Sequence, residues 1–264
     1  MNSNFELDQS QIDKFNNDGF LLLDLNIDLS LIDQALEDMQ TIHLKKPKMD
    51  FYQQGQRIQD GWKYSKAVHG LATEKNVLRC LDTLYERKAL PFQTLNFPYG
   101  TQQKLHSDTV HFNSMPSGFM AGAWIALEDV DRENGPLVYY PGSHKLQEYN
   151  MQDLGLEAGR QQYADYEAFM ENWAKTSGND PYYGVMKKGQ VIFWHANLLH
   201  GGSKHTNKKR TRHSQVTHYF FEGCKYYTPM SSTPDNIHWR DPTWIPREPE
   251  SLKAKIKRFF FSRK

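Results

Sequence analysis

Short runs of strand-forming residues, separated by turn signals, follow one another from Pro91 onward and restrict the fold more than any other feature of this sequence. The runs are short, rich in β-branched and aromatic residues, and bounded by glycine, proline and polar residues. There are six of them: 92–97, 103–106, 119–127, 137–140, 191–194 and 214–221. Their spacing predicts a sandwich or jelly roll rather than alternating βα units.

Helical patterns precede this β region. Apolar residues at helical spacing, Ile12 and Phe15 before a break at Asp18-Gly19 and Ile32 and Leu36 after it, predict two helices around a short strand at 20–25. Residues 41–66 are polar and contain proline and glycine, which predicts a loop, and 76–88 return to helical spacing. The sequence therefore predicts a mainly β fold with flanking helices.

At 264 residues the chain is long enough for one sizeable core. We expect a single domain over 1–264, with a helical part at about 1–90, a β core at about 91–222 and an extension at about 223–264. A helical, acidic and aromatic insertion at about 146–186 interrupts the core. It is either a lid over the mouth of the barrel or a helix packed on its outside.

Charge and composition limit the partners. Lys and Arg number 32 and Asp and Glu 31, so a net charge of +1 gives no field that would attract nucleic acid, and we expect a small-molecule substrate. The two cysteines, Cys80 and Cys224, form no C-x-x-C pair and indicate reduced thiols. The sequence contains no apolar stretch of membrane-spanning length and starts without a leader pattern, so we expect a cytoplasmic protein.

The last residues, 251–264, carry six Lys or Arg beside three consecutive phenylalanines. Such a basic and aromatic tail could dock on an anionic membrane surface. The alternative is a solvated tail whose aromatic rings pack onto the domain.

Metal-binding chemistry is indicated by His106 and Asp108. In a strand, residues two apart face the same side, so this imidazole and this carboxylate would converge on one point. A third ligand from a distant strand is available in His195 or His200. Two histidines and one carboxylate on one face of an octahedron leave the opposite positions open, as in non-haem iron(II) oxygenases.

An arginine follows on the next predicted strand. Alternation places Arg212 and Ser214 on one face, where both could reach one anionic group, and a guanidinium suits a carboxylate. The alternative is that Arg212 belongs to the solvated basic loop that contains Lys208, Lys209 and Arg210.

Taken in order, several motifs resemble the phytanoyl-CoA dioxygenase family of iron(II)- and 2-oxoglutarate-dependent oxygenases. They are QIDKFNNDGFLLL, LHSD, AGAWIALEDV, NGPLVYYPGSH, LLHGGS and RHSQVTHYF, and they extend over most of the chain. The resemblance implies a double-stranded β-helix, a jelly-roll or cupin-like fold, with Fe(II) and 2-oxoglutarate as cofactors.

Carried over by position, the resemblance makes His200 the distal iron ligand beside His106 and Asp108, and it pairs Arg212 with the C5 carboxylate of 2-oxoglutarate. Further cosubstrate contacts are then expected from residues that line the same barrel: Ser214, with Ser203 as a competitor, and Trp124, Gln93 and Asn96. His195 would lie behind the ligands or in the substrate pocket, and His111 would face the substrate or be structural.

The implied reaction is hydroxylation of an aliphatic C–H bond with dioxygen, giving succinate and CO2. Related halogenases carry a small residue where this chain has Asp108, so the carboxylate favours hydroxylation. Two rivals remain open from the residues alone: a non-catalytic jelly-roll module that binds a ligand, and a cupin-like metal enzyme that does not use 2-oxoglutarate. The sequence does not identify the substrate.

Overall fold

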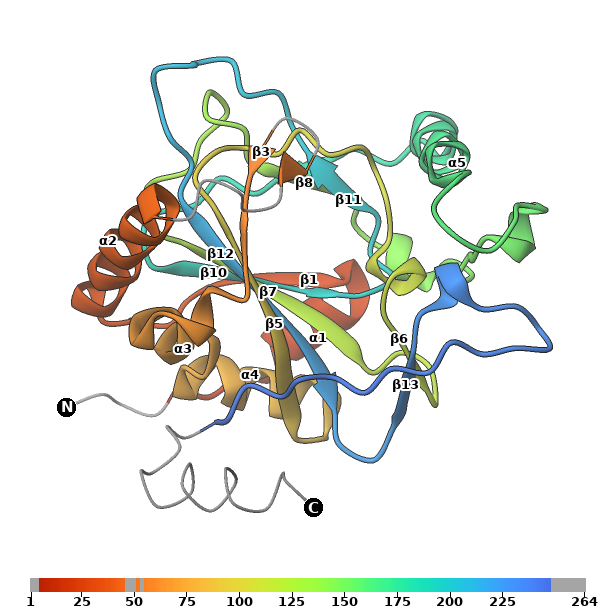
Figure 1. The fold of residues 1–264 in the computed structure, drawn as a ribbon, viewed down its shortest axis with the longest axis horizontal. Helices are drawn as coiled ribbons and strands as arrows, with labels where there is room; N and C mark the ends of the chain where they lie inside the picture. Colours follow the sequence, from red (N-terminus) through yellow and green to blue (C-terminus); the bar gives the residue numbers. More distant parts are fainter. Residues whose placement is uncertain (1–4, 46–50, 53–54, 248–264) are drawn as a thin grey trace.

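The structure, a computed structural model, describes residues 5–45, 51–52 and 55–247 (Figure 1). The α-helices are α1 (Gln9–Asp18), α2 (Leu29–Lys45), α3 (Lys66–Ala72), α4 (Lys75–Tyr85) and α5 (Tyr163–Thr176). Short 3-10 helices are η1 (Gly61–Lys63), η2 (Asp108–Val110), η3 (Ser143–Lys145), η4 (Gln152–Leu154) and η5 (Pro229–Ser231).

Thirteen strands are assigned in the described residues. They are β1 (Phe20–Asp24), β2 (Phe51–Tyr52), β3 (Gly55–Gln56), β4 (Ile58–Gln59), β5 (Ala89–Phe97), β6 (Asn113–Met115), β7 (Met120–Ala126), β8 (Leu137–Tyr139), β9 (Tyr182–Tyr183), β10 (Gln190–His195), β11 (His200–Gly202), β12 (Ser214–Phe221) and β13 (Lys225–Tyr227). Six form a major sheet in the order β1-β10-β7-β12-β5-β4, and three form a minor sheet in the order β11-β8-β9. Strands β6 and β13 form a separate pair, as do β2 and β3.

The two sheets face each other across a shared apolar cluster. Trp124 and Ile192 from the major sheet pack with Tyr139 from the minor sheet and with Leu198, which precedes β11. Figure 1 shows β8 and β11 on one side of the major sheet and helices α2, α3 and α4 on the other. The predicted jelly-roll fold with flanking helices is confirmed.

Residue alternation in the major sheet separates a helix-facing side from an interior side. Strand β7 directs Ala121, Ala123 and Ile125 toward the helices, where they share a core with Ile32 and Leu71. Residues Gly122, Trp124 and Ala126 face the interior, and the register aligns Trp124 with both Ile192 of β10 and Val216 of β12. The interior face is therefore the one that can hold a ligand.

The first helix ends as the sequence predicts. Asp8 caps α1 by accepting a hydrogen bond from the Gln11 amide, while the Gln11 side chain returns to the Asp8 amide. Gly19 closes the helix with φ 81°, a left-handed conformation that favours glycine, and β1 follows at once. The predicted helix, strand and helix in this part of the chain are confirmed.

Two local predictions were wrong. Residues 41–66 are not a simple loop, because α2 reaches Lys45 and short strands and η1 follow. Residues 103–106 do not form a strand, and His106 makes only an isolated bridge with His200. The reason is local: after β5 the backbone of the described chain is hydrogen-bonded to β11 only through the His106–His200 pair and the bond from the Gly202 amide to the Gln103 carbonyl, and it then turns into η2.

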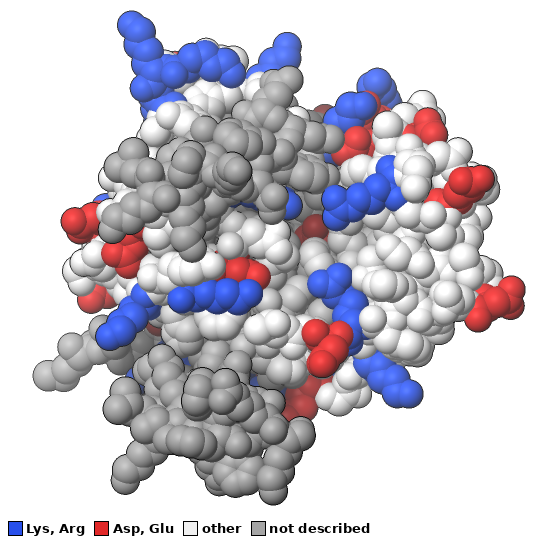
Figure 2. Space-filling view, viewed as in Figure 1, with Lys and Arg blue, Asp and Glu red and all other residues white. Residues whose placement is uncertain are grey.

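The insertion at 146–186 contains α5, which packs through Tyr163, Tyr166 and Met170 against Val110 and Leu199. The basic tail at 251–264 lies outside the described residues. No helix among the residues that the structure describes is long and apolar enough to cross a membrane. Figure 2 shows positive and negative side chains interspersed over the visible face, as expected from a net charge of +1.

Candidate metal centre

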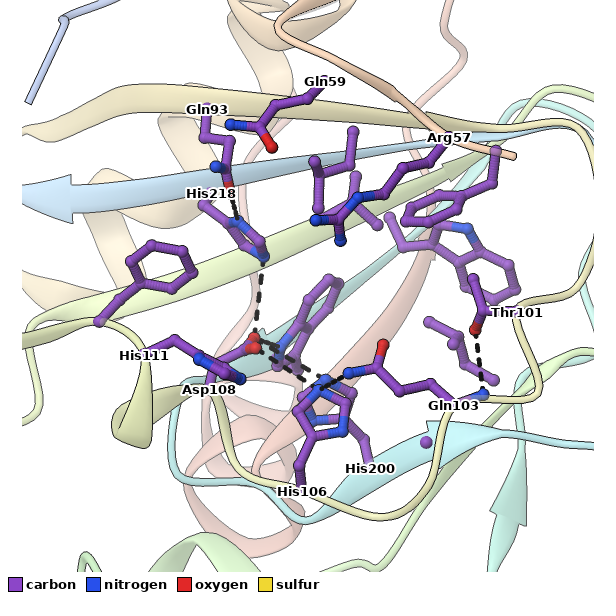
Figure 3. A pocket seen from close by; sticks show the side chains of 18 of the residues that line it. Arg57, Gln59, Gln93, Thr101, Gln103, His106, Asp108, His111, His200 and His218 are labelled. Atoms are coloured by element: carbon purple, nitrogen blue, oxygen red, sulfur yellow. Dashed lines mark hydrogen bonds and ion pairs between the residues drawn. The ribbon is translucent and has the colours of Figure 1, made fainter. Parts of the chain in front are cut away.

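Three side chains from two segments of the chain converge inside the barrel: His106, Asp108 and His200, here called the metal triad. All three are buried, and their candidate ligand atoms lie within 4.8 Å of one another. The Nε2 atoms of His106 and His200 each lie 3.8 Å from an Asp108 carboxylate oxygen (Figure 3). This spacing suits one cation held between the three groups.

The proximal pair converges by a different route from strand alternation. The backbone of His106 exchanges hydrogen bonds with His200 at 2.9 and 3.0 Å. Asp108 is the first residue of η2, and the Ser107 side chain caps that helix by accepting from the Thr109 amide. The turn at Ser107, rather than a continued strand, aims the carboxylate at the two imidazoles.

Both imidazoles of the triad are oriented by backbone carbonyls. The Nδ1 atom of His106 lies 2.8 Å from the Lys104 carbonyl oxygen, and Nδ1 of His200 lies 2.8 Å from that of Leu198. A carbonyl only accepts, so each Nδ1 donates and each Nε2 carries the lone pair that could bind a metal. Hydrogen bonds of this kind set the tautomer and the ring direction of metal-binding histidines.

The protonation states also suit a metal. Burial, with a smaller effect from the neighbouring His200, lowers the pKa of His106 to about 3. Burial raises the pKa of Asp108, but nearby His200, His218 and His106 lower it more, and the resulting pKa is about 2. A neutral imidazole and an ionised carboxylate are the forms that bind cations.

A tryptophan behind the triad holds the carboxylate in place. The indole Nε1 of Trp194 donates to Asp108 Oδ2 at 2.9 Å. The ring has room because position 122 is glycine: a Cβ there would lie 2.1 Å from the Trp194 ring. Gly122 on β7 and Trp194 on β10 are register partners. The motif AGAW thus contains a glycine that the metal centre requires.

Two glycines after His200 allow β11 to lie close to the backbone of Gln102 and Gln103. A Cβ on Gly201 would lie 2.8 Å from the Gln103 carbonyl oxygen, and one on Gly202 would lie 2.7 Å from the Gln102 amide nitrogen. Those contacts are to backbone, which cannot swing aside. The sequence HGG therefore brings β11 against the segment that carries His106.

The metal triad lies in a cavity of about 330 Å³ that Arg212 also lines. The Arg212 side chain is 1% exposed; it donates from Nη1 to Ser214 Oγ at 2.6 Å and from Nη2 to the Tyr99 carbonyl at 3.2 Å. Its Nε is buried without a hydrogen-bond partner, and within the described residues no carboxylate lies within ion-pair distance of it. A buried cation of this kind suits an anionic ligand.

Two aromatic rings lie near the Arg212 guanidinium. Its guanidinium carbon lies 5.3 Å from the Trp124 ring centre and 5.7 Å from that of Phe97. Burial lowers its pKa to about 10, so the group still carries its charge near neutral pH. The metal triad and Arg212 therefore present one cation site and one fixed positive charge in a single cavity.

Of the other predicted site residues, Trp124 and Gln93 line this cavity and Ser214 contacts Arg212. The Gln93 side chain is hydrogen-bonded to Nδ1 of His218 at 2.9 Å, so it acts at least partly through that histidine. Asn96 does not line the cavity. It lies on the helix-facing side of β5, where it donates to Gln215 at 3.1 Å, because strand alternation separates it from Gln93.

The structure also places the residues that the sequence offered as alternative site residues. His195 lies outside the cavity, stacked on Tyr85 with ring centres 6.2 Å apart, and does not converge with the triad. Ser203 donates to the Pro136 carbonyl at 2.8 Å and has no contact with Arg212. His111 lines the cavity and shares a hydrogen bond of 3.0 Å with the Tyr163 hydroxyl of α5.

Sequence reasoning missed His218. Its Nε2 lies 3.8 Å from Asp108 Oδ2, and burial lowers its pKa to about 4 (Figure 3). The same alternation that pairs Arg212 with Ser214 reaches His218 four residues later and could have indicated it. Gln103, whose amide nitrogen lies 3.2 Å from Nε2 of His106, was also missed, because alternation in the predicted strand at 103–106 would place these two residues on opposite faces.

Comparison with known proteins agrees with this site. A family model described as phytanoyl-CoA dioxygenase (PhyH) matches residues 15–214. Peroxisomal phytanoyl-CoA dioxygenase of Homo sapiens is 30% identical over 142 residues, which are 52% of this chain and 39% of that protein. The enzyme of the same name from Rattus norvegicus is 29% identical over 141 residues, again 52% and 39%. These alignments span about two fifths of the relatives' length.

Solved structures share the fold at low identity. The non-haem α-ketoglutarate-dependent carbocyclase SnoK from nogalamycin biosynthesis has a TM-score of 0.68 at 14% identity, covering 84% of this chain and 87% of that one. EctD from S. alaskensis with 2-oxoglutarate and 5-hydroxyectoine has a TM-score of 0.67 at 16% identity, covering 94% and 86%. Because the family model spans most of the jelly roll and all three residues of the metal triad, the chain belongs to the phytanoyl-CoA dioxygenase family.

Proposed function

We propose that this protein is an iron(II)- and 2-oxoglutarate-dependent oxygenase that hydroxylates an aliphatic C–H bond of a small molecule, with succinate and CO2 as coproducts. One observation carries the proposal: a His, Asp and His triad lies in the same cavity as a buried arginine that has no acidic partner among the described residues. A cation site and an anion site in one cavity suit a metal with a dicarboxylate cosubstrate.

The roles of the residues follow from their contacts. His106, Asp108 and His200 would hold the iron, and Arg212 with Ser214 would bind the distal carboxylate of the cosubstrate. The rings of Trp124 and Phe97, which lie near the guanidinium, would help to shield that carboxylate from water. A water-poor setting strengthens the pairing of the two charges. Bound iron(II) with 2-oxoglutarate supplies the oxidising chemistry for the C–H bond.

The side chains of the protein would orient the reactants, whereas the cofactors would supply the oxidising chemistry. Trp194 fixes the Asp108 carboxylate by a hydrogen bond, and backbone carbonyls fix both imidazoles of the triad. A cation held by these three side chains would be open to the cavity that they line, where substrate and cosubstrate could enter. The carboxylate at position 108 occupies the place that chloride would need, which favours hydroxylation over halogenation.

The named relatives support the same chemistry. SnoK is described as α-ketoglutarate-dependent, and EctD has been solved both with bound Fe and with 2-oxoglutarate. Those descriptions concern the other proteins. For this chain they favour iron and 2-oxoglutarate over the two rivals, a non-catalytic binding module and a metal enzyme that works without 2-oxoglutarate.

The first experiment measures binding and turnover separately. Oxygen-free protein loaded with iron(II) is titrated with 2-oxoglutarate while the metal-to-ligand absorption band is followed, and succinate is then assayed after air is admitted. We expect one iron per chain, a saturable band and slow succinate release. Absence of iron binding would support the binding module, and iron binding without the band would support the other metal enzyme.

The second experiment identifies the reaction type. A library of small molecules is screened for compounds that accelerate succinate release, and the products are analysed by mass spectrometry under isotopically labelled dioxygen. We expect one labelled oxygen atom in the product or in its breakdown product. A chlorinated product in chloride buffer would contradict the assignment, as would product formed without 2-oxoglutarate.

A further inference from the structure

The cavity carries more positive charge than a cosubstrate needs. Besides Arg212, it is lined by Arg57, Arg160 and Arg240, and Asp108 is the only acidic residue in the lining that the structure describes. Figure 3 shows the Arg57 side chain directed into the cavity, above the metal triad. With a bound cation facing Asp108 and a dicarboxylate held by Arg212, Arg160 and Arg240 would still offer positive charge to a further anionic group.

Arg240 has the contacts of a residue prepared for an anion. Its Nη1 donates to Thr228 Oγ1 at 3.0 Å, and Thr228 lines the cavity as well. Its Nε is buried with no hydrogen-bond partner, and within the described part of the chain no carboxylate is within ion-pair distance. A buried N–H group without an acceptor is costly unless a ligand accepts from it.

Aromatic contacts connect Arg240 to the metal centre. Its guanidinium carbon lies 4.8 Å from the Phe112 ring centre, and that ring lies 5.2 Å from the His218 ring. His218 in turn lies 3.8 Å from Asp108. A ligand whose anionic group is held at Arg240 could therefore pass over Phe112 and place a carbon beside the metal, a few bonds from the charge.

Arg160 belongs to the same end of the cavity. The amide of Gly159, the residue before it, donates to the Met230 carbonyl at 2.7 Å, so the turn at 159–160 is joined to η5. Met230 and Ser231 of η5 line the cavity too. Arg160 is exposed, as expected of a group at the entrance, whereas Arg240 is half-buried.

We propose that Arg240, assisted by Arg160 and Arg57, binds a carboxylate or phosphate group on the prime substrate, so that the substrate of this oxygenase is a small anionic molecule with an aliphatic part. The assignment rests on the proposed function, because it concerns the substrate of that reaction. Phe112 and Met230 provide the apolar contact for the aliphatic part. Two separate anion sites then serve two ligands, with Arg212 for the cosubstrate and Arg240 for the substrate.

The test uses matched pairs of probes that differ in charge. Hexyl phosphate is compared with hexan-1-ol, and hexanoate with hexanamide, by calorimetric titration into oxygen-free protein saturated with iron(II) and 2-oxoglutarate. We expect each anion to bind wild type at least about tenfold more tightly than its neutral partner, since charge-assisted hydrogen bonds add affinity of that order. The better of the two anions indicates which group the substrate carries.

Variants assign the effect to a residue. Arg240→Gln removes the charge but keeps a side chain that can hydrogen-bond to Thr228, and it should lower anion affinity about tenfold to hundredfold. Affinity for hexan-1-ol should not change. Arg87→Gln is the control, because Arg87 also lies over a phenylalanine ring, 3.9 Å from Phe119, but does not line the cavity.

Several outcomes would overturn the proposal. They are equal affinity of wild type for charged and neutral probes, unchanged anion affinity in Arg240→Gln, or loss of 2-oxoglutarate binding in that variant, which would make Arg240 the cosubstrate residue. The absorption band in the same samples tests the proposed function independently. If wild type fails to bind 2-oxoglutarate while Arg212→Gln still prefers hexyl phosphate to hexan-1-ol, the anion site stands and the proposed function falls.

Discussion

At the scale of single residues, the metal triad depends on three side chains that each supply one ligand atom. Changing His200 or Asp108 to Ala removes a third of the protein ligands, and we expect iron occupancy to fall far below one per chain at micromolar iron. His195→Ala is the control, since His195 is a comparable histidine that lies outside the cavity. Metal analysis after gel filtration measures the result. Loss of iron in His195→Ala but not in His200→Ala would reverse the assignment of the distal ligand.

A second test at the scale of single residues measures how substitutions of Arg212 change the affinity for 2-oxoglutarate. Its truncation to Ala would leave a buried carboxylate unpaired, which typically costs about 2–5 kcal/mol, so 2-oxoglutarate affinity should fall roughly thirtyfold to a few thousandfold. Arg212→Lys should recover only part, because an ammonium lacks the planar fork. Iron binding should survive both changes.

Arg210 is the matched control for that titration. It lies two residues away and pairs with Asp131 on the surface, so Arg210→Ala should bind 2-oxoglutarate like wild type. If Arg212→Ala also binds as wild type does, the cosubstrate would have to be placed elsewhere or abandoned.

At the scale of elements, the fit between β7 and β10 is decisive. Gly122→Ala would put a methyl group 2.1 Å from the Trp194 ring and push that ring off Asp108. We expect a loss of roughly 1–3 kcal/mol in the free energy of unfolding, typical of overpacking, and weaker iron binding. Urea denaturation and metal titration measure the two effects.

Trp194→Phe separates the effect of the hydrogen bond to Asp108 from the effect of overpacking at Gly122. It keeps an aromatic ring against Gly122 but removes the indole N–H that donates to Asp108. We expect iron affinity to fall without the loss in the free energy of unfolding that overpacking causes. Unchanged iron affinity in Trp194→Phe would show that the carboxylate needs no support from this strand.

At the scale of the whole molecule, buried neutral histidines couple stability to pH. Burial is the main cause that lowers the pKa of His106 to about 3 and those of His111, His195 and His218 to about 4. In the unfolded chain these groups titrate near 6.5. Below that pH the unfolded state takes up protons that the folded state does not, so the free energy of unfolding should fall as pH decreases toward 4.

The expected slope reaches up to about 1.4 kcal/mol per pH unit for each histidine. Urea denaturation of the metal-free protein between about pH 7 and about pH 5 would measure it. His195→Gln removes one titrating group outside the metal centre and should reduce the slope by about one proton. A flat profile over this window would contradict the neutral, buried state of these rings.

The sequence by itself determined the fold class and indicated all three residues of the metal triad. Period-two runs, turn signals and the break at Asp18-Gly19 are local features, and local features specify which elements form. The order of the family motifs along the chain is enough to single out His106, Asp108, His200 and Arg212. Alternation along β12 carries enough information to indicate His218 as well, because that residue shares a strand face with Ser214.

Only the tertiary structure decided which faces meet. Gln93 and Asn96 are three residues apart on one strand and look alike in sequence, yet one faces the cavity and the other faces the helices. Arg240 comes from a segment beyond the last jelly-roll strand, with no pattern that connects it to His106. Such residues become neighbours through contacts between distant segments, and a single sequence contains no periodicity for contacts of that kind.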